Sequence, residues 1–214
     1  MAGEGGLLMC TWPKGGADKA SGGGNPTFVG YFIECMTGFE YQVAAHMVWE
    51  GLVTEGLAIT RAVHDRYAAA KRNPYNEIEC SDHYSRAMMS YGVFLAACGF
   101  EHHGPKEHIG FAPRVSPENF HGPFTAAQGW GTYRQRCSGS EQTHQLDVLW
   151  GRLSARTMSV AVAEGTTVRR AEVLLGNTPL ACTAKQEGTR VQLTLNESTT
   201  VTPGKSLSIR IQLG

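Results

Sequence analysis

The spacing of apolar residues changes near residue 104, and this change constrains the fold more than any other feature of the sequence. Before it, apolar residues recur at intervals of three and four; after it, they alternate with polar residues. The first period is typical of α-helices and the second of β-strands. We therefore expect an α+β protein with two domains: a helical part over residues 1–104, and an antiparallel, β-sandwich-like, strand-rich domain over residues 105–214.

Three helices are predicted in the first part. The segment from Gly38 to about Ala70 carries a helical apolar pattern that two glycines, Gly51 and Gly56, interrupt, so we expect two helices joined by a short turn. A third helix is expected from Ser81 or Asp82 to Cys98. Its sequence leaves little polar surface, which predicts burial on most sides.

Strands are predicted in the second part from alternating segments bounded by glycines. The clearest cover residues 146–149, 158–162, 191–195 and 207–211. Glycines and Pro-Gly or Gly-Asn pairs separate them at the spacing of a sandwich. We expect three aromatic residues to pack between the sheet and the helices: Phe124, Trp130 and Tyr133.

Charge and composition exclude several classes of partner. The chain has 19 basic and 19 acidic residues, so no basic excess indicates nucleic-acid binding. Residues 1–104 carry more acids than bases and residues 105–214 the reverse, so the two parts can attract each other. No apolar run predicts a membrane span, and no signal peptide is evident, so we expect a cytoplasmic protein. Its six cysteines form no C-x-x-C pair and are expected to be reduced thiols.

The densest group of polar residues lies at 73–86. If the chain is extended there, Glu77 and Glu79 point to one side, and Asp82 and Arg86 are spaced one helical turn apart. Three acids and an arginine can hold several hydroxyl groups through charge-assisted hydrogen bonds. They can equally form a capping network with a surface ion pair, and the residues by themselves favour that interpretation.

Other candidate chemistry has less support. Cys80 and His83, even with the histidines at 102, 103 and 108, lack the paired spacing of a zinc site, and we predict neither metal nor cofactor. A Cys-His hydrolase would need an activated thiolate beside its base, which nothing in the sequence indicates. Glu34 lies in an apolar stretch, so its carboxylate needs a partner or a function unless it sits on an exposed loop.

Several motifs together resemble the C-terminal part of the bacterial glucosylceramidase-like proteins of glycoside hydrolase family 116. They are the glycine-rich GEGGLLMCTWPKGG at residues 3–16, TGFEYQVAAHM from Thr37, NPYNEIECSDHYSRAM from Asn73 and FTAAQGWGTY from Phe124. They cover most of the chain in the family's order.

The resemblance implies a fragment of a retaining β-glucosidase built on an (α/α)6 barrel, whose nucleophile and acid/base carboxylates lie upstream of this region. Glu77 and Arg86 match a Glu and an Arg of the family that hold the sugar, and Glu34 matches a further sugar-binding Glu. The family has Asp and Trp where this chain has Ile33 and Met36. No catalytic residue is expected in the chain itself.

Two functions from different classes follow. The chain is either a part or subunit of a glucoside-hydrolysing enzyme that supplies sugar-binding residues, or a non-catalytic carbohydrate-binding or interaction module derived from such an enzyme. Because three helices would be only part of a barrel, we expect an exposed apolar face that a protein partner or a second copy of the chain covers.

Overall fold

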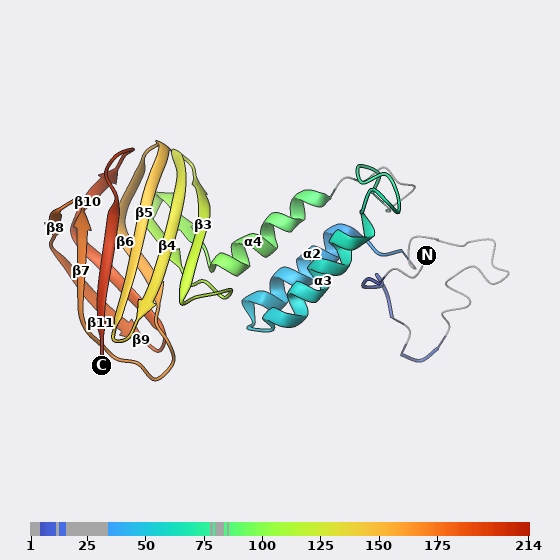
Figure 1. The fold of residues 1–214 in the computed structure, drawn as a ribbon, viewed down its shortest axis with the longest axis horizontal. Helices are drawn as coiled ribbons and strands as arrows, with labels where there is room; N and C mark the ends of the chain where they lie inside the picture. Colours follow the sequence, from blue (N-terminus) through green and yellow to red (C-terminus); the bar gives the residue numbers. More distant parts are fainter. Residues whose placement is uncertain (1–4, 12, 16–33, 78, 80–83, 85) are drawn as a thin grey trace. The chain divides into compact units, whose positions relative to one another are not determined.

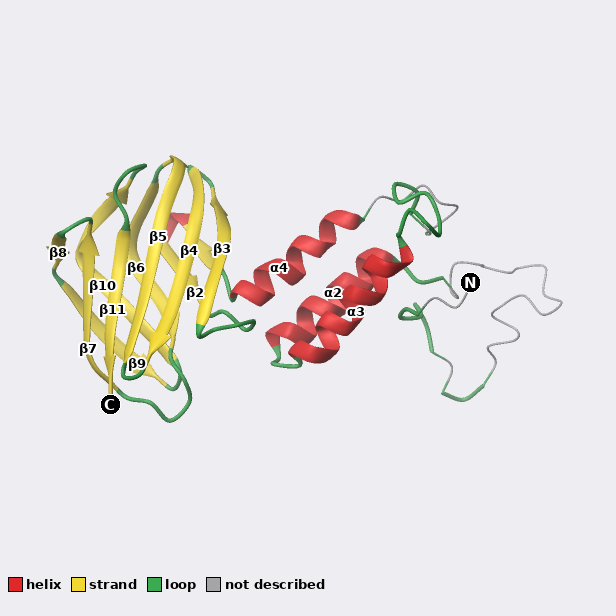
Figure 2. Cartoon of the chain, in the orientation of Figure 1, coloured by secondary structure: helices red, strands yellow, loops and turns green. Residues whose placement is uncertain are grey.

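The structure is a computed structural model that describes residues 5–11, 13–15, 34–77, 79, 84 and 86–214. It divides into two compact units, Met1–Ala97 and Cys98–Gly214. The helical first unit and the strand-rich second unit confirm the predicted α+β class (Figure 2). Along the chain, the boundary between the units lies a few residues before residue 104, because the first strand of the sandwich already begins at Glu101.

Among the described residues, the helical unit contains two long helices and a shorter third one. Their bounds, with a 3-10 turn before the last, are α2 Thr37–Trp49, α3 Val53–Arg66, η2 Ala87–Met89 and α4 Ser90–Cys98. Only Gly51 interrupts the first two, with a φ of 88° that favours glycine in the turn.

The other expected break, Gly56, lies inside α3 and serves to bring the two helices together. A methyl group at this position would meet the Ala44 carbonyl oxygen at 2.7 Å and Val48 Cγ2 at 2.8 Å. Both of these residues are fully buried on α2. The glycine therefore permits a close approach of two helix backbones. From the sequence pattern alone, the same glycine is interpreted as a break in the helix.

We expect Gly56→Ala to destabilise the helical unit, although the same change in an exposed helix is stabilising by about 1 kcal/mol. The added methyl group forces α2 and α3 apart, an overpacking cost of about 1–3 kcal/mol. Gly92→Ala in α4 is the matched control, since its nearest neighbour would lie at an ordinary 3.8 Å. Thermal unfolding should show a lower midpoint for the first variant and an unchanged or higher one for the second. Equal midpoints would contradict the packing argument.

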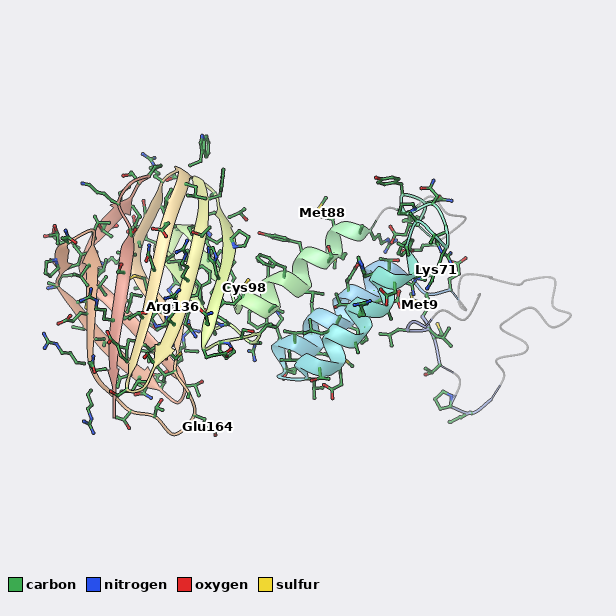
Figure 3. All side chains as sticks on the ribbon, in the orientation of Figure 1. Met9, Lys71, Met88, Cys98, Arg136 and Glu164 are labelled. Carbon is green, nitrogen blue, oxygen red and sulfur yellow. The ribbon has the colours of Figure 1, made fainter. Side chains whose placement is uncertain are left out.

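The third helix differs from its prediction in length and burial. It begins at Ser90, whereas Ser81 and Asp82 lie outside the described residues. Ala96 and Cys98 are buried, but Met88 of η2, labelled in Figure 3, is 85% exposed and Tyr91 is half-exposed. The expectation of burial on most sides is therefore wrong: apolar composition does not by itself supply neighbours for every face.

The second unit is a sandwich of two sheets (Figure 1). The order is β1-β2-β6-β10-β9 in the five-stranded sheet and β3-β4-β5-β11-β7-β8 in the six-stranded one. The strands are β1 Glu101–His103, β2 His108–Phe111, β3 Asn119–Ala126, β4 Gly129–Ser138, β5 Glu141–Gly151, β6 Leu153–Ala161, β7 Val168–Leu175, β8 Thr178–Leu180, β9 Cys182–Glu187, β10 Arg190–Val201 and β11 Leu207–Leu213. All neighbours pair antiparallel except β2 and β6.

The four predicted alternating segments fall in β5, β6, β10 and β11, the strands that place most apolar side chains in the core. Phe124 and Tyr133 also lie in this core, and Tyr133 stacks on Phe111 with ring centroids 3.8 Å apart. Trp130 is 47% exposed. The expectation that these aromatics separate sheet from helices is therefore wrong, because strand alternation sends two of them between the sheets.

A chain of buried polar side chains runs along the inner side of the six-stranded sheet, from β5 across β4 to the segment before β3. The Tyr133 hydroxyl lies 2.7 Å from His144 Nδ1 and donates to Gln135 Oε1 at 2.8 Å, and Gln135 Nε2 donates to the Pro117 carbonyl. The hydroxyl has one proton, so it accepts from His144, which assigns the proton of the neutral imidazole to Nδ1. Burial lowers the pKa of His144 to about 3.

No helix formed by the described residues is both long and apolar enough to cross a membrane.

Candidate functional site

A cavity of about 360 Å³ opens in the helical unit. Its lining is rich in hydroxyl groups and aromatic rings: Thr37, Tyr41, His64, Tyr67, Ala68, Pro74, Tyr75, Glu77 and Ala87. The first two residues belong to α2, and His64 belongs to α3. Tyr67 and Ala68 follow α3, Ala87 begins η2, and the 73–77 segment supplies the others. The size is that of a small-molecule site, and rings combined with hydroxyls and a carboxylate suit a polar ligand that also has an apolar face.

Glu77 is the acidic residue of this lining, and its side chain is buried. Its Oε2 accepts a hydrogen bond of 2.6 Å from the backbone N–H of Arg86. Its Oε1 is buried and has no hydrogen-bond partner among the described residues. A buried carboxylate oxygen without a partner is costly, so a hydrogen-bond donor brought to this atom would stabilise the site.

Arg86 lies beside Glu77 and is held by aromatic and acidic neighbours. Its guanidinium carbon lies 4.7 Å from the centre of the Tyr84 ring and 5.4 Å from that of Phe39. Its Nε is 3.1 Å from Glu79 Oε1. A methyl group on Gly38 would meet the Arg86 side chain at 2.8 Å, so glycine at the start of α2 makes room for it.

Glu79 completes a group of acids around Arg86. Its side chain is fully buried, and burial raises its pKa, with Arg86 opposing the rise and the charges of Glu77 and Glu34 adding to it. Glu34, a half-buried residue before α2, is thus within electrostatic reach of Glu79. The structure brings together all three predicted site residues, Glu77, Arg86 and Glu34, around Glu79.

The extended backbone on which this grouping was predicted is absent. The Glu79 N–H donates to the Glu77 carbonyl at 3.0 Å, which makes a tight turn rather than a strand. Both carboxylates nevertheless reach Arg86, one through its backbone and one through its guanidinium. The same geometry is compatible with the capping and with the ligand-holding interpretation. One oxygen of Glu77 accepts a backbone hydrogen bond, and the other has no partner among the described residues.

Glu40 of α2 and Arg66 of α3 form a second buried ion pair, which the sequence pattern did not predict. Arg66 Nη1 donates to Glu40 Oε1 at 3.2 Å, and Arg66 Nη2 contacts the other carboxylate oxygen. The Leu7 N–H also donates to Glu40 Oε1 at 2.9 Å. A methyl group on Gly6 would meet Arg66 Nη1 at 2.5 Å. The pair therefore fastens the N-terminal glycine-rich segment to α2 and α3.

The pair also acts on the cavity, because Tyr41 lies next to Glu40 in α2. Burial raises the pKa of the Tyr41 hydroxyl, with Arg66 opposing the rise. Thr37 Oγ1 and the Tyr67 hydroxyl lie 2.9 Å apart. Each of these hydroxyls can both donate and accept a hydrogen bond. No spacing in the sequence links Tyr41 and Tyr67; only the packing of α2 on α3 does.

Metal chemistry finds no support in the described chain. Cys80 and His83 lie outside the described residues, and the histidines expected on a loop lie on β1 and β2. Among the residues that the structure describes, no group of three His, Cys, Asp or Glu side chains could hold a metal ion. The thiol of Cys98 is buried, which raises its pKa to about 11 and leaves it protonated.

Comparison with known proteins gives little further guidance. No protein-family model matches the chain, and no curated protein matches it. One solved structure to which it is similar is an alpha-L-rhamnosidase from Dictyoglumus thermophilum, with a TM-score of 0.35 and 10% sequence identity. The match covers 61% of this chain and 14% of that one.

Proposed function

We propose that the chain is part of a glycoside hydrolase acting on β-glucosides and that it supplies the sugar-binding residues Glu77, Arg86 and Glu34. The nucleophile and the acid/base then lie outside this chain, on the remainder of an (α/α)6 barrel. The single observation that carries the proposal is the buried Oε1 atom of Glu77, which has no hydrogen-bond partner among the described residues, on a residue that lines a cavity with three tyrosines. A charged acceptor beside aromatic rings suits a sugar, whose hydroxyls donate while its ring C–H face packs on aromatics.

The carboxylates favour binding over catalysis in this chain. Retaining hydrolysis needs two carboxyl groups about 5 Å apart on either side of the sugar. Here Glu77 and Glu79 both contact Arg86, and Glu79 is not part of the cavity lining. Arg86 holds both carboxylates: Glu79 forms an ion pair with it, and Glu77 accepts its backbone N–H. We therefore assign the chemical step to groups outside this chain.

Glu77→Gln should weaken the binding of a β-glucoside by about 10- to 150-fold, the range for losing a hydrogen bond to a charged group. The fold should survive, because the amide oxygen still accepts the N–H of Arg86. Titration calorimetry with an alkyl β-glucoside measures the loss, and thermal unfolding checks the fold. Glu50→Gln, on the exposed end of α2, is the matched control and should change neither. Unchanged affinity with a lower melting temperature would make Glu77 a scaffold residue only.

The alternative is a non-catalytic carbohydrate-binding or interaction module. A hydrolysis assay distinguishes this alternative from a part of an enzyme. Exposed apolar residues on the helical unit favour assembly with a partner or a second copy: Phe39, Val43, Trp49, Leu52, Leu57, Met88, Met89 and Tyr91. If the coding sequence upstream supplies the rest of the barrel, the complex should cleave a chromogenic β-glucoside that the chain alone leaves intact. A complex without turnover favours the module. Robust turnover by the chain alone, abolished by Glu77→Gln, would overturn the binding role.

A further inference from the structure

A β-bulge at the end of β5 places two tryptophans side by side on the outer face of the six-stranded sheet. Trp130 pairs directly with Trp150, whereas the next residue of β4, Gly131, pairs with Val148. Leu149 is therefore the extra residue. Before the bulge, even-numbered residues of β5 point into the core; after it, Trp150 shares the outward side of Trp130. The two indoles are 64% and 47% exposed.

Three glycines make this arrangement obligatory rather than incidental. A methyl group on Gly131 would meet the Asp147 carbonyl oxygen at 1.9 Å, and one on Gly129 would meet the Trp150 carbonyl oxygen at 2.6 Å. Gly151 adopts a φ of 76°, which favours glycine. The backbone around the tryptophan pair is thus closely packed and paired, so the positions from which the two side chains leave the sheet are well defined.

The same face carries a cationic hollow further along the strands. β4 turns Trp130, Thr132, Arg134 and Arg136 outward in succession. A depression of about 360 Å³ is lined by Arg134, Arg136 and Arg210 together with Thr143, Gln145 and Ser208. In the register, Arg136 is opposite Thr143 and Thr143 is opposite Arg210, so two strand spacings, about 10 Å, separate the arginines. Figure 3 labels Arg136 on this sheet.

The same face also carries acids, Asp147 and Glu141 on β5 and Glu172 on β7, but none of them forms an ion pair with these arginines. Among the described residues, no acid lies within ion-pair distance of Arg134, Arg136 or Arg210. Glu172 is opposite Arg210 in the register, but Arg170 lies 2.5 Å from its carboxylate. Arg134 and Arg136 are about 7 Å apart along the strand. Three guanidinium groups with free donors in one hollow suit a ligand with several carboxylates.

We propose that this outer face binds an acidic oligosaccharide of the uronide type. The C–H face of one sugar ring packs on Trp130 and Trp150, and the carboxylates of the following sugars bind Arg134, Arg136 and Arg210. From Trp130 to Arg136 the strand spans about 20 Å, enough for several linked sugars. The tryptophans form a small apolar island in a polar face, unlike the aromatic and apolar core of a protein interface.

The site lies wholly in the sandwich unit, so it is independent of the cavity at Glu77. The test is titration calorimetry of the full chain with an oligogalacturonate. Two double variants should each weaken binding about ten-fold or more. One combines Trp130→Ala with Trp150→Ala, and the other combines Arg134→Gln with Arg136→Gln. Substituting phenylalanine for both tryptophans should retain much of the affinity, because the rings still stack. Melting temperatures of all variants should stay close to that of the parent, since these side chains are exposed.

Two controls keep the result specific. Arg156→Gln, an exposed arginine on the other sheet, removes one charge and should leave affinity unchanged. Glu77→Gln should also leave it unchanged, which separates this site from the sugar cavity. The proposal is overturned if the parent chain does not bind the oligogalacturonate, or if it binds a neutral glucan of equal length or single-stranded DNA equally well. Indifference of binding to the arginine substitutions would overturn it too.

Discussion

Arg66→Met will unfold the helical unit under conditions in which the parent unit is folded. The Arg66 side chain is 0% exposed and Glu40, its partner, 1%. Methionine leaves the Glu40 carboxylate buried and, among the residues that the structure describes, with only the Leu7 N–H to compensate its charge. Removing one partner of a buried ion pair costs about 3–5 kcal/mol. That is a large fraction of the total stability of an ordinary domain, about 5–15 kcal/mol.

Two further variants separate charge burial from packing. In Glu40→Leu with Arg66→Met neither charge remains buried, so most of the lost stability should return, because apolar replacements of buried ion pairs are often neutral or stabilising. Arg61→Gln breaks the exposed Arg61–Asp65 pair of the same helix and should leave the stability nearly unchanged, because water screens an exposed pair. Hydrogen exchange at the amides of α2 and α3 measures all three. A double variant as unstable as Arg66→Met would show that shape, not charge, causes the loss.

The sandwich will lose stability as the pH falls below about 6.5, because of His144. Its folded-state pKa of about 3 lies well below the usual value of 6.5, since burial disfavours the imidazolium. Between these two values the unfolded chain binds a proton that the folded chain does not. Stability is therefore full above pH 6.5 and falls as the pH approaches 3. The loss is on the order of several kcal/mol over the whole interval.

The interval from pH 6.5 to 5 separates histidines from the carboxylates. Burial also lowers the pKa of His102 on β1, so this residue contributes to the slope in the same direction as His144. The Arg190 guanidinium lowers the pKa of Glu101, so the stability contributed by that carboxylate is lost only at more acidic pH. Calorimetric melting of the sandwich should show a steep slope in this interval, and His144→Phe should flatten it from a lower starting stability. His46→Gln, at an exposed histidine of α2, should keep the slope. A slope that survives His144→Phe would assign the pH dependence to other groups.

The candidate site was predictable only where its residues lie close in sequence. Glu77 and Arg86 are nine residues apart in one polar segment, and the structure joins them through a backbone hydrogen bond. Glu40 and Arg66 lie on different helices, 26 residues apart, and nothing in their local pattern indicates a pair. A buried ion pair of this kind is invisible to periodicity, because a charged residue on an amphipathic helix is expected to face water.

The sequence by itself determined the type of each half and the strands of the sandwich core. Apolar periodicity records which side of a segment is buried, and that is a local property of helices and strands. The tertiary structure alone decided what each buried side meets. It set the approach of α3 to α2 at Gly56, the gathering of tyrosines around the cavity, and the register slip that turns Trp150 outward. These depend on backbones that are distant in the chain coming within contact distance, which no local pattern specifies.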